Sequence, residues 1–368
     1  MAEIDNPESE AVEASSPRNK AARSAHSGGT HKSTIFDVAA QAGVSIKTVS
    51  RVVNNEPNVS EKTREKVQAA VTTLNYQPNA AARGLSSKRS YVIGLIYENA
   101  HEFSYTKDVL DGALASCERN GFTLLLRPLT LPNSAVEDQV RSFVVQAAVE
   151  GVLLPAPVGD LPGVQRVLRE RQLPYATITP KLPPDDGLNV FCDDGSAVEA
   201  LVLHLVELGH SKIGFIKGHP DHRASDDRYA GYCKALQDHG IAVEEKWVES
   251  GLFTFDSGKA AARNLLDSSE PPTAIIASND DMAGGVLFEA RERGLQVPHD
   301  LSVAGFDDTP IAAQTWPPLT TVRQPISEMA LSLTNALIQK VGGQPSELSS
   351  APFGCEVVIR GSTAKPGH

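Results

Sequence analysis

Residues 39–54 read AAQAGVSIKTVSRVVN, and this stretch predicts two short helices separated by a tight turn. Ala39 is small enough to let the two helices approach closely, and Gly43 suits the turn between them. Val49, six residues after the glycine, lies on the second helix and is expected to face the core. Because each residue type answers a different steric demand, the spacing is typical of a helix-turn-helix.

The flanking residues extend this pattern to three helices. Thr34 is expected to cap the first helix, Ser45 the second, and Ser60 precedes a third. Apolar residues of the third helix recur at helical spacing, namely Val67, Ala70, Val71 and Leu74. We expect Pro78 to end this helix, since proline interrupts helical hydrogen bonding.

The second helix offers a polar face opposite its valines. A helix in the major groove presents side chains one turn apart, and arginine and lysine suit guanine or phosphate there. We expect base reading by Ile46, Lys47, Ser50 and Arg51, and phosphate contacts by Thr34, Ser45, Thr48 and Asn54. The alternative is a solvated helix in a bundle that does not bind DNA.

The charge is divided unevenly along a chain of 368 residues with a formal charge of −11. Residues 18–90 carry twelve basic and four acidic side chains, a formal charge of +8. Residues 1–17 carry −5 and residues 91–368 carry −14. This division indicates that only the basic segment meets a nucleic acid.

The composition is that of a cytoplasmic protein with two or three domains. No apolar run approaches the roughly 20 residues of a membrane span, and the N-terminus lacks a secretory signal. The four cysteines have no paired spacing and are expected to be small buried side chains. Residues 1–32 are polar and are predicted to be a disordered tail, whose basic part could touch phosphate weakly or have no role.

After residue 91, apolar runs rich in β-formers alternate with segments of helical length. The runs are YVIGLIY, TLLLRPL, GVLLPAP, YATIT, NVFCDD, KIGFIKG, TAIIASND, LSVAGFDD and CEVVIRG. Such alternation predicts parallel sheets covered by helices on both faces. About 270 residues of this pattern exceed one common sheet, so two α/β lobes are expected.

The run TIFDVAAQAGVSIKTVSRVVNNEPNVSEKTREKVQAAVTTLNYQPNAAARGL strongly resembles the headpiece of the lactose/galactose repressor family. The resemblance implies a helix-turn-helix domain over residues 33–78 and a hinge helix and linker over residues 79–90. In that family the hinge helix folds when two protomers meet on an operator. By resemblance the hinge and minor-groove residues are Asn79, Ala82, Arg83 and, as the wedge that enters the groove, Leu85.

Two features of the headpiece leave alternatives open. Leu85 could instead pack between domains. Ile46 replaces an aromatic residue that some family members have, so the inner bases of the operator are not inferred from relatives.

Residues 91–363 resemble the periplasmic-binding-protein-like effector domain of the same family, followed by a tail over residues 364–368. The phrases that carry the resemblance are LVELGHSKIGFIKGHPDHRASDDRYAGY, SNDDMAGGVL, LSVAGFDDTPIAAQ and PPLTTVRQPI. It implies an α/β body of two lobes, joined by three crossings near residues 210, 320 and 343, that forms a homodimer. A small effector, often a sugar, is expected in the cleft between the lobes.

Six residues are expected to contact this effector: Asp280, Arg228, Phe253, Asp194, Tyr105 and Asp307. Asp280 could instead cap a helix, Arg228 could form a structural ion pair, and Phe253 could belong to the core. In the first-lobe loop, Phe103 or His101 could take the place of Tyr105.

Other functions are less well supported by these residues. His219, Asp221 and His222 could coordinate zinc, but their spacing matches no strong signature and a polar loop explains them. No catalytic motif, dinucleotide fingerprint or P-loop is present, so neither an enzyme nor a cofactor is expected. We therefore expect a repressor of a carbohydrate operon that is controlled by a sugar or a sugar derivative. A sugar-binding transport protein or a sugar-modifying enzyme on the same body is the alternative.

Overall fold

The computed structural model describes residues 33–53, 58–76, 89–98, 103–183, 187–346 and 348–367. The chain divides into two units, residues 1–79 and 80–368. The tail over residues 1–32 lies outside the described ranges. So do Asn54 and the expected hinge residues Asn79, Ala82, Arg83 and Leu85.

The first unit contains three helices, α1 (Ile35–Ala42), α2 (Ile46–Val53) and α3 (Glu61–Thr73). Thr34 caps α1 in a reciprocal capping box with Asp37, and the Ser45 hydroxyl accepts from the Thr48 amide at 3.1 Å. Gly43 joins α1 to α2 with φ +66°, where a side chain would be strained. The three helices enclose a core of Val38, Ala39, Val49, Val52, Val67 and Ala70.

The helix ends of this unit differ slightly from the expectation. Ser60 precedes α3 as predicted, but its hydroxyl bonds to that of Thr63 at 2.8 Å rather than to a backbone amide. The third helix ends at Thr73, before the proline that was expected to stop it. Asn75 follows in a left-handed turn with φ +44°, which is a conformation that asparagine tolerates.

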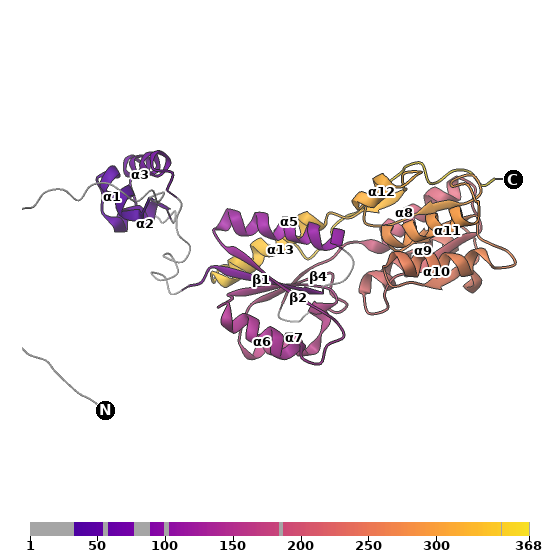
Figure 1. Cartoon of the computed structure of the whole chain (residues 1–368), viewed down its shortest axis with the longest axis horizontal. Helices are drawn as coiled ribbons and strands as arrows, with labels where there is room; N and C mark the ends of the chain where they lie inside the picture. Colours follow the sequence, from indigo (N-terminus) through magenta and orange to yellow (C-terminus); the bar gives the residue numbers. More distant parts are fainter. Residues whose placement is uncertain are drawn as a thin grey trace, which may run out of the picture. The chain divides into compact units, whose positions relative to one another are not determined.

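Lobe 1 of the second unit is a five-stranded parallel sheet in the order β2-β1-β3-β4-β5 (Figure 1). Its strands are β1 (Val92–Glu98), β2 (Thr123–Leu129), β3 (Gly151–Pro155), β4 (Tyr175–Ile178) and β5 (Leu188–Val190). Its helices are α5 (Phe103–Asn120), α6 (Val136–Gln146), α7 (Pro162–Glu170) and α13 (Ile326–Val341), with the 3-10 turn η1 (Val158–Asp160). One core lies under α5 and α13 and a second under α6 and α7.

Lobe 2 repeats this architecture with a four-stranded parallel sheet in the order β7-β6-β8-β9. Its strands are β6 (Ile213–Lys217), β7 (Val248–Ser250), β8 (Ala274–Ala277) and β9 (Ser302–Ala304). Its helices are α8 (Asp194–Glu207), α9 (Arg223–Asp238), α10 (Phe255–Leu266), α11 (Asp280–Glu292) and α12 (Pro310–Gln314), with the turn η2 (Glu245–Trp247). The cores on the two faces lie under α8 and α9 and under α10 and α11.

The predicted parallel sheets with helices on both faces are confirmed, and every predicted run contains a strand. Two strands were missed, β7 and β10 (Thr321–Arg323), each only three residues long. The last predicted run forms β11 (Glu356–Val358), which pairs antiparallel with β10 rather than joining a parallel sheet. This two-stranded sheet packs against the core under α8.

The chain passes between the lobes three times, at residues 191–193, 324–325 and 342–355. Lobe 1 ends with β5, lobe 2 begins with α8, and α13 returns to lobe 1 before β11 re-enters lobe 2. The first and third passages pair with each other, since Cys192 bridges to Phe353. The crossing expected near residue 210 is therefore wrong, because His210 is buried within lobe 2 beside Thr273 and Ser302.

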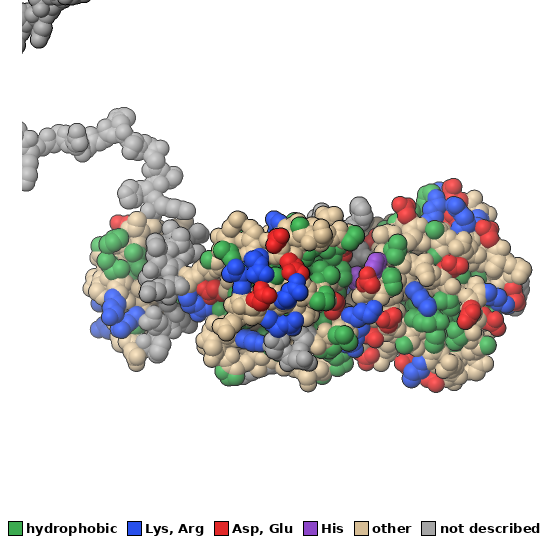
Figure 2. Space-filling view, turned by 90° about the horizontal axis from the view of Figure 1, so that it is seen from below, with side chains coloured by type: hydrophobic (Ala, Val, Ile, Leu, Met, Phe, Trp, Pro, Cys, Tyr) green, Lys and Arg blue, Asp and Glu red, His purple; other side chains and the backbone are tan. Residues whose placement is uncertain are grey.

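None of the helices in the described ranges is long and apolar enough to cross a membrane. Figure 2 shows acidic and basic side chains interspersed over both lobes of the second unit, with histidine at the seam between them.

Candidate functional site

The second helix of the first unit separates an apolar face from a polar one. Val49 and Val52 are buried on α2, whereas Ile46, Lys47 and Arg51 are exposed. Ser50 and Thr48 are half-buried on the same helix, and Thr34 and Ser45 are exposed at the helix starts. Ile46 is 41% exposed, and an exposed isoleucine side chain can make apolar contact with a thymine methyl.

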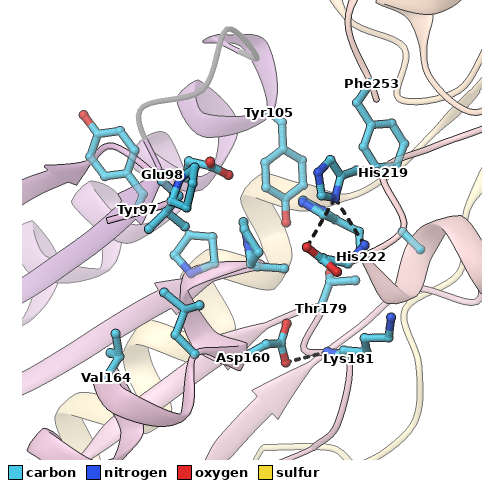
Figure 3. A pocket seen from close by; sticks show the side chains of 18 of the residues that line it. Tyr97, Glu98, Tyr105, Asp160, Val164, Thr179, Lys181, His219, His222 and Phe253 are labelled. Carbon is cyan, nitrogen blue, oxygen red and sulfur yellow. Dashed lines mark hydrogen bonds and ion pairs between the residues drawn. The ribbon is translucent and has the colours of Figure 1, made fainter. Parts of the chain in front are cut away.

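A cleft of about 1050 Å³ lies between the two lobes of the second unit, and both lobes line it (Figure 3). Its residues follow the carboxyl ends of strands, which is where open α/β sheets bind ligands. Glu98 ends β1, Asp160 follows β3, and Thr179 and Lys181 follow β4. From lobe 2, His219 and His222 follow β6 and Phe253 follows β7.

Arg228 of α9 lies at the base of this cleft and is only 4% exposed. Its guanidinium donates to Asp194 at 3.0 Å and to the Ser278 carbonyl, and lies 3.6 Å from Asp307. It also stacks 3.7 Å from the centre of the Phe306 ring. These contacts hold the cation in one orientation.

At the base of the cleft, the charges of Arg228, Asp194 and Asp307 depend on one another. Burial lowers the pKa of the Arg228 guanidinium, but Asp194 and Asp307 raise it by more. Burial raises the pKa of Asp194, against the opposing effect of Arg228. Removal of either partner would leave a buried charge uncompensated.

An aromatic group lines the lobe 2 side of the cleft. The His222 ring stands edge-on to Phe253, with centroids 5.4 Å apart, and His219 stands against His222 at the same distance. Burial, followed by the neighbouring cations, lowers the pKa of His222 to about 4, so this imidazole is neutral at pH 7. Gly218 makes room for the Phe253 ring, since a Cβ there would lie 2.0 Å from it.

Three residues with a strained backbone lie at the cleft. Thr179, Phe253 and Asp307 have φ values of +51°, +59° and +107°, in a region that side chains rarely occupy. All three line the cleft. Such strain is typical of ligand-binding sites, where the surrounding structure holds a residue in place.

The lobes also touch at the mouth of the cleft. Lys181 of lobe 1 donates to the Pro220 carbonyl of lobe 2 at 2.8 Å and lies 3.7 Å from Asp226. The Lys181 amide donates to Asp160 at 2.7 Å. Burial raises the pKa of Asp160, and burial likewise raises that of Glu98.

Four of the six expected effector residues line this cleft together: Tyr105, Arg228, Phe253 and Asp307. Tyr105 is half-buried on α5, and burial raises the pKa of its hydroxyl group. Asp194 does not line the cleft, and it lies behind Arg228 as its ion-pair partner. The alternative that Arg228 forms a structural ion pair is therefore also confirmed. The same side chain both binds Asp194 and lines the cleft.

Asp280 does not belong to the cleft. It is fully buried in the first turn of α11, and its carboxylate accepts from the Thr309 amide at 2.7 Å and the Thr321 hydroxyl at 2.6 Å. Both carboxylate oxygens thus accept hydrogen bonds from lobe 2 itself, and the expected contact of Asp280 with an effector stays a prediction. The cap of α11 is Asn279, whose side chain accepts from the Met282 amide.

Several cleft residues were missed from the sequence: Tyr97, Glu98, Asp160, Thr179, Lys181 and Gln324. The sequence could have pointed to two of them, because Glu98 directly follows the predicted strand YVIGLIY and Thr179 ends the predicted strand YATIT. His101 lies outside the described residues, as does the side chain of Phe103, so the choice of Tyr105 over them stays a prediction.

All four cysteines are free, but two of them meet. Ligand atoms of Cys192, Asp194 and Cys355 lie within 4.8 Å of one another at the paired first and third crossings. Within the described ranges this is the only such cluster, so His219, Asp221 and His222 do not form one. Arg228 already binds Asp194, and the Cys192 sulfur lies 3.2 Å from that of Met329.

Comparison with known families matches both units. Residues 34–79 match the family described as bacterial regulatory proteins, lacI family. Residues 202–363 match the periplasmic binding protein-like domain.

Known proteins resemble the chain over nearly its whole length. The HTH-type transcriptional regulator MalR of Streptomyces coelicolor is 35% identical over 91% of this chain and 98% of its own. The HTH-type transcriptional repressor PurR of Vibrio campbellii is 32% identical over 90% and 99%.

Solved structures resemble it to a similar extent. A transcriptional regulator CelR–cellobiose complex has a TM-score of 0.68 at 30% identity and covers 90% of this chain and 99% of its own. The lac repressor dimer bound to operator and the anti-inducer ONPF has a TM-score of 0.70 at 28% identity with the same coverage.

Proposed function

The chain belongs to the lacI family of bacterial regulatory proteins and is a DNA-binding transcriptional regulator, and from this premise we propose that it represses a carbohydrate-utilisation operon. A sugar or a sugar derivative in the interlobe cleft would control the repression. One observation carries the proposal: the chain joins a helix-turn-helix with an exposed polar face to a cleft of about 1050 Å³ lined by two lobes.

We propose that the first unit reads the operator as a homodimer. In each protomer Ile46, Lys47, Ser50 and Arg51 contact base edges, and the phosphate contacts come from Thr34, Ser45, Thr48 and Asn54. Residues 79–90 form a hinge in which Leu85 enters the minor groove, with Asn79, Ala82 and Arg83 beside it. Two copies would bind two half-sites related by twofold symmetry.

The cleft supplies the control. An effector that binds one arrangement of the lobes better than another shifts the population toward that arrangement. Since three passages connect the lobes, a change in their angle alters the separation of the two hinges in the dimer. Operator affinity then changes through a coupling free energy between the two sites.

The test begins with an operator selected from randomised palindromic duplexes by the full-length protein. Fluorescence anisotropy would then measure operator affinity with and without a panel of sugars and sugar phosphates, at a stated salt concentration because phosphate contacts are salt-dependent. We expect one or more sugars to change the affinity. No selected sequence, or a selected sequence on which no sugar acts, would contradict the DNA or the effector part of the proposal respectively.

A further inference from the structure

We infer that the cleft binds an uncharged carbohydrate of two or more linked rings, in preference to a single ring or a phosphorylated sugar. This inference rests on the proposed function and specifies the chemical class of its effector. Three independent features carry it: the length of the cleft, the state of its cations and the nature of its walls.

The cleft is long enough for more than one sugar ring. Its volume of about 1050 Å³ lies at the upper end of the roughly 300–1,000 Å³ typical of small-molecule sites. Tyr97 and Val164 lie at one end of it and Phe253 at the other, with Tyr105 and Thr179 between (Figure 3).

Two loops of lobe 1 extend the cleft away from the crossings. Residues 130–137 and 155–164 both contribute to its lining. A single ring held at Arg228 would leave this extension filled with water, whereas a chain of rings would occupy it.

The cations of the cleft are already engaged within the protein. Arg228 is bound to Asp194, Asp307 and a backbone carbonyl, and Lys181 to Pro220 and Asp226. Burial keeps the His222 imidazole neutral at pH 7.

Carboxylates outnumber these cations along the walls, which carry Glu98, Glu137, Asp160, Asp221 and Asp307. A phosphate dianion would have to displace existing ion pairs and lie beside these carboxylates, at a Coulombic cost. An uncharged ligand meets no such penalty.

The walls suit the two kinds of surface that a sugar presents. Half-buried Tyr97 offers flat apolar surface to the C–H face of a pyranose ring at one end of the cleft, and Phe253, only 5% exposed, adds a small apolar contact at the other. Between them, Asp160, Gln324 and Thr179 offer hydrogen-bonding groups to hydroxyls. The His222 ring stands edge-on to the Phe253 ring, so these two rings do not enclose a flat nucleobase between them.

Isothermal titration calorimetry of the full-length protein tests the ligand class directly. The probes are maltose, maltotriose, cellobiose, cellotriose, sucrose, raffinose and xylobiose, with glucose, glucose 6-phosphate and hypoxanthine as the competing classes. We expect one of the oligosaccharides to bind at least about tenfold more tightly than all three competitors. The inference is overturned if a competitor binds most tightly or if none of the oligosaccharides binds.

Variants at the far end of the cleft test the length of the ligand. Tyr97→Ala should weaken binding of the preferred oligosaccharide about tenfold while leaving the weaker binding of glucose unchanged. Tyr97→Phe, which keeps the ring, should bind the oligosaccharide nearly as the parent does. Equal affinity of Tyr97→Ala and the parent for the oligosaccharide would contradict an extended site.

The same preparations separate this inference from the proposed function. If an oligosaccharide binds but does not change operator affinity, the ligand class stands and the regulatory role fails. If glucose 6-phosphate or hypoxanthine binds most tightly and changes operator affinity, the regulatory role stands and the ligand class fails.

Discussion

At the scale of single residues, the recognition helix offers the most direct test. Arg51→Ala should weaken binding to the selected operator by about 1–3 kcal/mol, because a fork of hydrogen bonds to a base is lost, and should weaken binding to random DNA much less. Fluorescence anisotropy on both duplexes measures the difference.

Lys66→Ala on α3 is the control for charge, since it also removes one exposed cation from the first unit. A loss of equal size with Lys66→Ala, or an equal loss on random DNA, would show that Arg51 acts through charge rather than base reading.

The buried carboxyl group of Asp280 leads to a prediction about how folding stability changes with pH. Burial raises its pKa to about 7, against the hydrogen bonds from Thr321 and Thr309 that lower it. Between its usual pKa of 3.8 and about 7 the folded protein keeps the proton while the unfolded chain releases it, so stability falls as pH rises. The contribution of this group is about 1 kcal/mol per pH unit over that window.

Urea unfolding between pH 5 and 8 measures the effect. In Asp280→Asn this part of the slope should disappear, so the difference in stability between variant and parent changes with pH. Parallel pH profiles for the two proteins would rule out a protonated Asp280 in the native state.

At the scale of elements, the hinge segment makes a prediction that the described residues do not test. Six or seven residues are too short for a stable helix in isolation, so residues 79–85 would become helical only on the operator. Leu85→Ala should reduce operator bending in a gel-phasing assay and leave effector affinity unchanged. Ser86→Ala, in the same segment but without an apolar side chain to insert, should bend the operator as the parent does; equal bending by both variants would refute the wedge.

Strands that lie in continuous apolar runs were predictable from sequence, and strands without such a run were not. Apolar runs of five to eight residues between helical segments located nine strands, because a strand buried on both faces needs a continuous run. Strands β7 and β10 each contain a single apolar residue, Val248 and Val322, so neither shows such a run. The first crossing was expected too late in the chain, since the extended segment at residues 191–193 reads like the end of a strand.

The site was predictable in part, and Asp280 shows what the sequence leaves undecided. A carboxylate after a strand of a two-lobed protein can face the cleft or its own lobe, and only the positions of Thr309 and Thr321 decide. Arg228 was placed in the cleft by resemblance, whereas Lys181 gave no comparable signal. Its role depends on Pro220 and Asp226, about 40 residues later in the sequence and across the mouth.

At the scale of the whole second unit, the contact that Lys181 makes between the lobes leads to a prediction about how lobe closure contributes to effector binding. An exposed ion pair contributes about 0.2–1 kcal/mol, so Lys181→Met should weaken effector binding by up to about fivefold by removing the interlobe contact. Calorimetric titration measures this change. Lys107→Met is the matched control, because Lys107 pairs with Asp111 inside α5 and lies outside the cleft lining; a similar loss in both variants would exclude a role in closure.

The fixed position of Arg228 has a consequence for the entropy of ligand binding. An arginine side chain carries about 2 kcal/mol of rotamer entropy, which is normally lost when a ligand immobilises it. Here Asp194, Ser278 and the Phe306 ring have already restricted that motion. A ligand that arrives at the base of the cleft therefore orders little there, and any entropic penalty of binding should come mainly from the movement of one lobe against the other.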